Sequence, residues 1–225
     1  EYYTIYLRNI ETNKIISEEI KDTSGSILFS LDDKYIFYSK LDENHRPKKI
    51  FRHEIGTSTK NDTLIFHEKT DAFTVNIGLS SDEKYYFINS SDHNTSEQYY
   101  FDINEKNPIP KLIQKRERGV LYSVNSWNGY FYMHTNKNAE DFKILRCAHS
   151  KINEWSEFIP AKQGTLIGSL TFLNNWIIRS ETSNALGKII LRDPKTSKEE
   201  EITFSDEDVI VPSISLTQKD KNTDE

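Results

Sequence analysis

The sequence predicts an all-β protein assembled from a repeated four-stranded unit, which is the β-propeller class. Alanine, the best helix former, occurs only five times in 225 residues, while aromatic residues make up 12% and suit half-buried strands. A hairpin pattern recurs along the chain at a spacing of about 47 residues, which is typical of propeller blades. We therefore expect about four complete four-stranded blades plus partial blades at both ends, resembling part of a seven-bladed propeller.

Each repeat opens with a hairpin, in which two apolar runs flank a short polar turn. The paired runs and their turns are expected at 24–30 and 35–38 around 32–34, at 73–80 and 85–88 around 81–84, at 120–125 and 130–133 around 128–129, and at 166–172 and 176–178 around 174–175.

A longer polar loop and two more strands complete each repeat. The third strands are expected at 48–55, 98–103, 142–148 and 188–192, and the fourth strands at 63–68, 111–114, 156–159 and 200–204. This simple up-and-down order is the connectivity of a propeller blade.

The second strand of each repeat carries apolar side chains at consecutive positions, as in Tyr35-Ile36-Phe37-Tyr38. Both faces of such a sheet must be buried, which blades packed between blades provide. A two-sheet sandwich is the alternative, but it prefers strict alternation with polar residues on its outer faces.

The two ends of the chain are expected to be incomplete blades. Runs at 2–10 and 15–20 are typical of the last two strands of a preceding blade, and 209–216 of the first strand of a following one. The predicted division is a blade end at 1–21, blades at 22–69, 70–117, 118–162 and 163–206, and a blade start or tail at 207–225. The segment is then either an arc of a larger ring, and thus a fragment, or a ring closed as five blades.

Charge and composition exclude several classes of partner. The net charge of −6 provides no basic footprint, so nucleic acid and anionic membranes are not expected to bind. No apolar run approaches the roughly 20 residues of a spanning helix. The single cysteine, Cys147, excludes an intrachain disulfide and favours a reducing, cytoplasmic location.

The run LDENHRPKKIFRHEIGT at 41–57 resembles the oligopeptidase B (protease II) group of the prolyl oligopeptidase family of serine peptidases. Further similar stretches follow in family order: NIET at 9–12, TSG at 23–25, HNTSE at 93–97, GVLYSV at 119–124, and 135–142. The resemblance implies a seven-bladed propeller that caps an α/β-hydrolase domain and an enzyme that cleaves short peptides after Arg or Lys. Its implied partners are that catalytic domain and short basic peptides.

No catalytic residue is expected in this chain. The nucleophile of such enzymes lies in a G-x-S-x-G elbow, and neither Gly25 nor Gly168 opens that pattern. Six histidines are present, but none forms a tight i, i+4 pair or has a nearby thiolate, so no metal site is predicted. No glycine-rich loop that would cradle a phosphate is present either, and no cofactor is expected.

The loops between the second and third strands are the better candidates for a functional surface, because up-and-down order places them all at one face. They are expected at 41–47, 91–97, 136–141 and 182–187. We expect this face to meet a catalytic domain or to line the cavity between domains. Its candidate residues are Asp42, Glu43, Asn44, His45, Arg46, His93, Thr95, Ser96 and Glu97. The alternative is that Asp42, Glu43 and Arg46 only pair locally and order their loop.

Acidic residues at 199–201 and 206–208 either attract basic peptides or form a solvated strand edge that prevents further strand pairing. The main functional hypothesis is a non-catalytic lid and size filter of a serine endopeptidase. The alternatives are a stand-alone propeller that binds a protein or peptide, or the product of a decayed peptidase gene. Exposed blade faces in an open arc also predict self-association.

Overall fold

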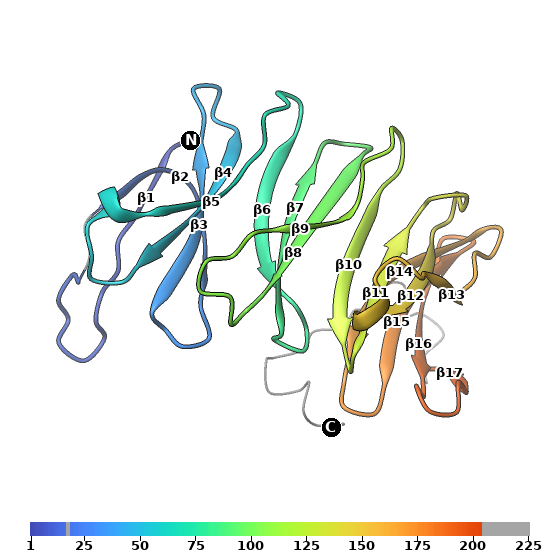
Figure 1. Cartoon of the computed structure of the whole chain (residues 1–225). Helices are drawn as coiled ribbons and strands as arrows, with labels where there is room; N and C mark the ends of the chain where they lie inside the picture. Colours follow the sequence, from blue (N-terminus) through green and yellow to red (C-terminus); the bar gives the residue numbers. More distant parts are fainter. Residues whose placement is uncertain (17–18, 204–225) are drawn as a thin grey trace. The chain divides into compact units, whose positions relative to one another are not determined.

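The computed structural model describes residues 1–16 and 19–203, and the fold is all-β (Figure 1). It divides into two compact units, one formed by Glu1–Val120 and one that begins at Leu121. Within the described residues, every strand pairs antiparallel with the strand that precedes or follows it in sequence. This is the up-and-down order that the sequence predicts.

The first unit contains a five-stranded and a four-stranded sheet. The first sheet comprises β1 (Tyr3–Ile5), β2 (Ile20–Phe29), β3 (Tyr35–Leu41), β4 (Pro47–Glu54) and β5 (Thr63–His67), with a 3-10 turn η1 (Thr59–Asn61) before β5. The second comprises β6 (Thr74–Leu79), β7 (Tyr85–Ser91), β8 (Ser96–Asp102) and β9 (Lys111–Gln114).

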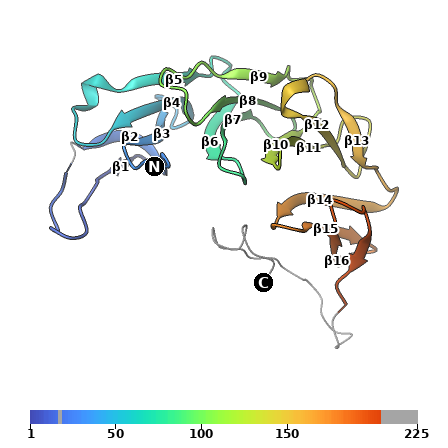
Figure 2. The ribbon, with the colours of Figure 1, turned by 60° about the horizontal axis from the view of Figure 1, so that its bottom comes forward.

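The second unit contains two four-stranded sheets, which Figure 2 shows from a second direction. The first comprises β10 (Tyr122–Trp127), β11 (Tyr130–Thr135), β12 (Lys143–Ala148) and β13 (Ser156–Ile159), with a 3-10 turn η2 (His149–Lys151) before β13. The second comprises β14 (Thr165–Phe172), β15 (Ile177–Ser183), β16 (Leu186–Arg192) and β17 (Glu199–Glu201).

Consecutive residues of the second strands are buried on opposite faces, as the sequence predicts. On β3, Phe37 packs between the two sheets of the first unit with Tyr86 and Ile88, while Ile36 and Tyr38 belong to a separate cluster on the other face. Their exposed fractions are 0% for Ile36, 3% for Phe37 and 4% for Tyr38. A sandwich would leave one of these faces wet, so the burial supports blades rather than a sandwich.

The N-terminal segment differs from the prediction of two strands in a preceding blade. The hairpin is present, since residues Arg8 and Ile15 form an antiparallel bridge. However, β1 hydrogen-bonds to the start of β2 and is the fifth strand of the first sheet. The length of β2 explains this, because Thr23 has β1 on one side and β3 on the other. The division into blades remains a prediction, and the expected strand at 209–216 lies outside the described residues.

The connection between β15 and β16 also differs from the predicted loop at 182–187. Only Asn184 and Ala185 separate the two strands, and both have positive φ, 50° and 63°. Two such residues form the type I′ turn of a tight hairpin. The sequence signal was weak because glycine, the usual second residue of this turn, is replaced by alanine. At β10–β11, Asn128-Gly129 forms the predicted turn with φ of 48° and 83°.

Candidate functional site

The loop between β3 and β4 contains five of the predicted site residues and is ordered by one carboxylate. Oδ1 of Asp42 accepts hydrogen bonds from the backbone N–H groups of Asn44 and Arg46, both at 2.9 Å. The Arg46 guanidinium then donates to the carbonyl of Asp71 at 2.5 Å. The Asp42 carboxylate therefore orders the loop through backbone N–H groups and not by pairing with the Arg46 guanidinium, which instead ties this loop to the connection between the two sheets.

The loop between β7 and β8 repeats the same device. Oδ1 of Asp92 accepts from the N–H groups of Asn94 and Thr95, at 2.9 and 2.8 Å. The Thr95 hydroxyl in turn accepts from the N–H of Gly119 at 3.2 Å. Asp side chains commonly bond the backbone two residues ahead in this way, so a shared D-x-N pattern builds both loops.

Lys48 is almost fully buried and holds the connection that follows β5. Its Nζ donates to the carbonyls of Thr70, Asp71 and Phe73, at 2.6, 2.9 and 2.5 Å. An ammonium group has three donors, and here each one meets a carbonyl. The buried charge is therefore satisfied by the main chain.

A cluster of charged side chains joins the two sheets of the first unit behind these loops. Arg116 Nη2 lies 2.6 Å from Glu68 and 2.7 Å from Glu97, and the Arg116 Nε donates to Glu97 at 2.9 Å. Ser90 donates its hydroxyl proton to Glu68, and the guanidinium lies 4.1 Å above the ring of Phe73. We call Glu68, Glu97 and Arg116 the inter-sheet ion cluster.

The hydrogen bonds of this cluster control its protonation. Burial alone would raise the pKa of Glu68, but donation from Ser90, the backbone of Thr70 and Arg116 outweighs it and lowers the pKa to about 2. Burial, together with the nearby Glu97, raises the pKa of the Tyr99 phenol to about 12. The carboxylate of Glu68 is therefore ionised, and the Tyr99 phenol neutral, throughout the physiological range.

The other predicted residues are divided between exposed and structural positions. Glu43 and His93 are exposed. The exposed His45 has its ring centroid 4.1 Å from that of Tyr2. Ser96 is buried, and its backbone N–H bonds the chain that follows β9. The structure thus brings Arg46, Thr95 and Glu97 into the framework of the loops and leaves Glu43, Asn44, His45 and His93 at the surface.

Sequence reasoning missed Lys48, Glu68 and Arg116. Glu68 and Arg116 are 48 positions apart, and no local pattern connects them. A signal was present at Lys48, which lies two positions before Ile50 in a predicted strand and therefore on the same, buried side, where its charge requires a partner.

The acidic residues of β17 are paired in the second unit. Oε1 of Glu199 accepts from Arg179 Nη1 at 2.9 Å and from Arg192 Nη1 at 2.6 Å, while Glu200 pairs with Lys198 and Glu201 with Lys188. Burial alone would raise the pKa of Glu199, but the two guanidinium groups lower it. These pairings support a strand edge more than a site for basic peptides; residues 206–208 lie outside the described part.

His53, His134 and Cys147 are packed or hydrogen-bonded within the fold and, among the described residues, do not form a reactive or metal-binding group. His53 is fully buried with Nδ1 at 2.7 Å from Asp62. The His134 ring stacks on Phe142, and burial lowers its pKa, so it is neutral. Burial raises the pKa of the Cys147 thiol to about 11. Among residues 1–16 and 19–203, no three His, Cys, Asp or Glu side chains are grouped as metal ligands would be.

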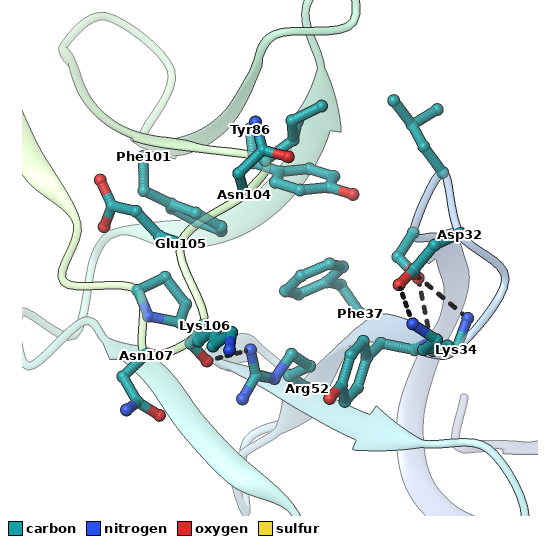
Figure 3. Close-up of a pocket in the computed structure, with 15 residues that line it drawn as sticks. Asp32, Lys34, Phe37, Arg52, Tyr86, Phe101, Asn104, Glu105, Lys106 and Asn107 are labelled. Atoms are coloured by element: carbon teal, nitrogen blue, oxygen red, sulfur yellow. Dashed lines mark hydrogen bonds and ion pairs between the residues drawn. The ribbon is translucent and has the colours of Figure 1, made fainter.

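A pocket opens beside the β2–β3 turn, at the end of the sheet opposite the β3–β4 loop. Figure 3 shows the residues that line it. Its volume is about 580 Å³, within the usual range for small-molecule sites. The turn between β2 and β3 forms one wall and the connection from β8 to β9 the other. Its floor consists of Phe37, Tyr86 and Phe101.

Comparison with known proteins identifies the family. The family model "Prolyl oligopeptidase, N-terminal beta-propeller domain" matches residues 1–225. The chain belongs to the prolyl oligopeptidase family. It forms part of the β-propeller of these peptidases, and the four antiparallel sheets agree with that fold. Among the described residues, no helix is long and apolar enough to cross a membrane.

Curated relatives and solved structures of the prolyl oligopeptidase family support this. The chain is 35% identical to Protease 2 of Moraxella lacunata over 157 residues, which is 67% of this chain and 23% of that protein. It is 30% identical to human Prolyl endopeptidase-like over 159 residues, 69% of this chain and 22% of the relative. The chain therefore spans less than a quarter of these relatives in the matched regions.

The structural neighbours include oligopeptidase B from Leishmania major, with a TM-score of 0.85 and 21% identity over 92% of this chain and 31% of that one. Oligopeptidase B from Trypanosoma brucei with covalently bound antipain has a TM-score of 0.79 and 23% identity, covering 84% of this chain and 28% of that one. At these identities the likeness establishes the fold.

Proposed function

We propose that this chain is the non-catalytic propeller portion of an oligopeptidase B-like serine endopeptidase that cleaves short peptides after Arg or Lys in the cytoplasm. The observation that carries the proposal is the 35% identity to Protease 2 within a match of the whole chain to the propeller family. The described side chains agree with a framework role, because the buried carboxylates of Glu68 and Glu97 are paired with Arg116.

The propeller acts as a lid and size filter over an α/β-hydrolase domain. Such a lid needs a rigid framework and an exposed surface toward its partner. Lys48 and the inter-sheet ion cluster supply rigidity beneath the loops. Glu43, Asn44, His45 and His93 are exposed on this face, and we propose that they contact the catalytic domain or substrate.

A peptide-length series with the complete protein tests this function. Short chromogenic peptides with Arg or Lys before the scissile bond should be hydrolysed, while peptides with Pro at that position should not. A long unfolded polypeptide containing the same cleavage sequence should be cleaved far more slowly. Equal cleavage of the short and long substrates would remove the size-filter role, and cleavage only after Pro would overturn the proposed specificity.

The contact role of the loops is tested separately in the complete protein. His93→Ala changes an exposed side chain of the proposed contact face, and Lys84→Ala changes an exposed residue in a turn at the other end of the second sheet as its control. A changed KM with unchanged stability in the His93 variant, but not in the control variant, supports contact with substrate or the catalytic domain. Unchanged kinetics in a His45→Ala, His93→Ala double variant would contradict it.

A further inference from the structure

The pocket of the first unit has a charge arrangement that the proposed function does not explain. It lies between strands β3 and β4 of the first sheet and β7 and β8 of the second, within one compact unit. Ionised side chains of both signs surround its mouth: Asp32, Lys34, Arg52, Glu105 and Lys106. Which of these charges are already paired decides what the pocket can bind.

Both carboxylates have cationic partners. Asp32 lies 3.2 Å from the Lys34 ammonium and also accepts the hydroxyl proton of Ser30 at 2.7 Å, and this hydrogen bond lowers the pKa of Asp32. Glu105 lies 3.2 Å from the ammonium of Lys111. The negative charges at the mouth are therefore compensated.

Two cations have no such compensation. Within the described ranges 1–16 and 19–203, neither Arg52 nor Lys106 has a carboxylate partner. Arg52 lies 4.6 Å over the ring of Tyr35 and donates one hydrogen bond, from Nη1 to the carbonyl of Lys106 at 2.8 Å. Figure 3 shows this bond beside the ring of Phe37. Because a guanidinium has five N–H donors, Nε and Nη2 are left to bind an anion at the pocket.

The rest of the pocket is apolar or neutral. Phe37, Tyr86 and Phe101 form an aromatic cluster with ring centroids 4.7 to 6.0 Å apart. Burial raises the pKa of the Tyr86 phenol, which stays neutral. Leu31 at the rim is 47% exposed. A ligand that fills this space therefore needs an apolar body as well as a negative group.

We propose that this pocket binds an apolar carboxylate of amino-acid to dipeptide size, such as the C-terminal residue of a short peptide with an apolar side chain. The carboxylate pairs with the Arg52 guanidinium, whose planar fork matches two carboxylate oxygens, and Lys106 adds a second cation. The apolar side chain packs against Leu31, Ile103 and Pro108, which line the pocket around the nearly buried aromatic rings. This site does not depend on the proposed peptidase activity.

Titration calorimetry of the full 225-residue chain with N-acetyl-L-phenylalanine tests the proposal, and N-acetyl-L-phenylalaninamide is the neutral control ligand. We expect saturable binding of the acid and at least about tenfold weaker binding of the amide, because a hydrogen bond to a charged group is lost. Amide NMR shifts should map to the pocket-lining residues. Absence of saturable binding, or equal binding of acid and amide, would overturn the site.

Protein variants test the assigned cations. Arg52→Gln should weaken binding of the acid about tenfold and leave the amide unchanged, and Lys106→Gln, at an exposed position, should also weaken the acid without affecting folding. Arg118→Gln, which removes an exposed Arg of the same unit outside the pocket, is the matched control. If inorganic phosphate bound as tightly as the acid, the pocket would be an unspecific anion site and the proposal would be contradicted. Unchanged affinity for the acid in both pocket variants would contradict it as well.

Discussion

Arg116 shows how a single residue connects two sheets. Its guanidinium contacts carboxylates from both sheets of the first unit, one just after β5 and one on β8. Glu68 and Glu97 retain only 4% and 6% side-chain exposure. Two buried carboxylates without a counter-charge would be strongly destabilising, so Arg116 is required once both acids are present.

Replacing Arg116 by Gln is expected to lower the free energy of unfolding by about 3 kcal/mol, because two buried carboxylates lose their counter-charge. Urea unfolding followed by circular dichroism measures the change. Arg118→Gln is the control, since Arg118 is exposed two positions further along. A loss no larger than that of the control would show that the ion cluster contributes nothing net.

The lowered pKa of Glu68 also predicts how the stability of the fold depends on pH. Its folded pKa of about 2 lies below the ordinary value of 4.5, so ionisation stabilises the folded state above pH 4.5. This contribution declines as the pH falls from 4.5 to 2 and is lost below 2. The free energy of unfolding, measured across this range, should fall less steeply in Glu68→Gln than in the native chain. Identical pH profiles would contradict the assignment.

At the scale of single elements, the hairpins were the most predictable feature. Ser30 donates to Asp32 at 2.7 Å, and Ser80 donates to Asp82 at 2.8 Å. The same residues occur at the same spacing in sequence, so local chemistry fixes both turns and the apolar runs fix the strands around them. By contrast, the pairing of β1 with β2 depends on contacts between positions about 20 residues apart, such as Tyr3 and Thr23. The local sequence pattern does not predict these contacts.

The turn between β15 and β16 contains a residue poorly suited to its conformation. Ala185 has φ of 63°, where a Cβ atom costs about 1 kcal/mol relative to glycine. Ala185→Gly should therefore raise the free energy of unfolding by up to about 1 kcal/mol. Ala139→Gly is the matched control, because Ala139 is not among the positive-φ residues, and it should be neutral or destabilising. Thermal unfolding distinguishes the two, and a lower midpoint for Ala185→Gly would refute the argument.

For the molecule as a whole, repetition made the fold class predictable from sequence, whereas the candidate site was only partly so. The polar residues between the apolar runs located the loop predicted at 41–47, whereas the loop predicted at 91–97 is shorter, because Ser96 and Glu97 already belong to β8. The charges beneath them were missed, since Glu68 and Arg116 meet only after two sheets have packed, and Lys48 bonds carbonyls of the connection between those sheets. The pocket was missed for the same reason, because Arg52 belongs to the first sheet and Lys106 to a connection of the second, and they come into contact only when the two sheets pack.

The chain by itself is expected to have no peptidase activity, because the sequence lacks a G-x-S-x-G nucleophile elbow. Incubation with an Arg-containing chromogenic peptide should give no release above buffer. The complete protein is the positive control. Turnover by the isolated chain that persists through repeated purification would contradict this expectation.

The pairing of each strand with its chain neighbour has a consequence for how the protein opens. Forming any one sheet closes only short loops, so the entropic barrier to reforming it is small. Individual sheets can therefore open and reclose locally without unfolding of the whole protein. Amide protons of the short outer strands β5 and β9 should exchange with deuterated solvent well before those of β3 and β7, which have a partner on each side.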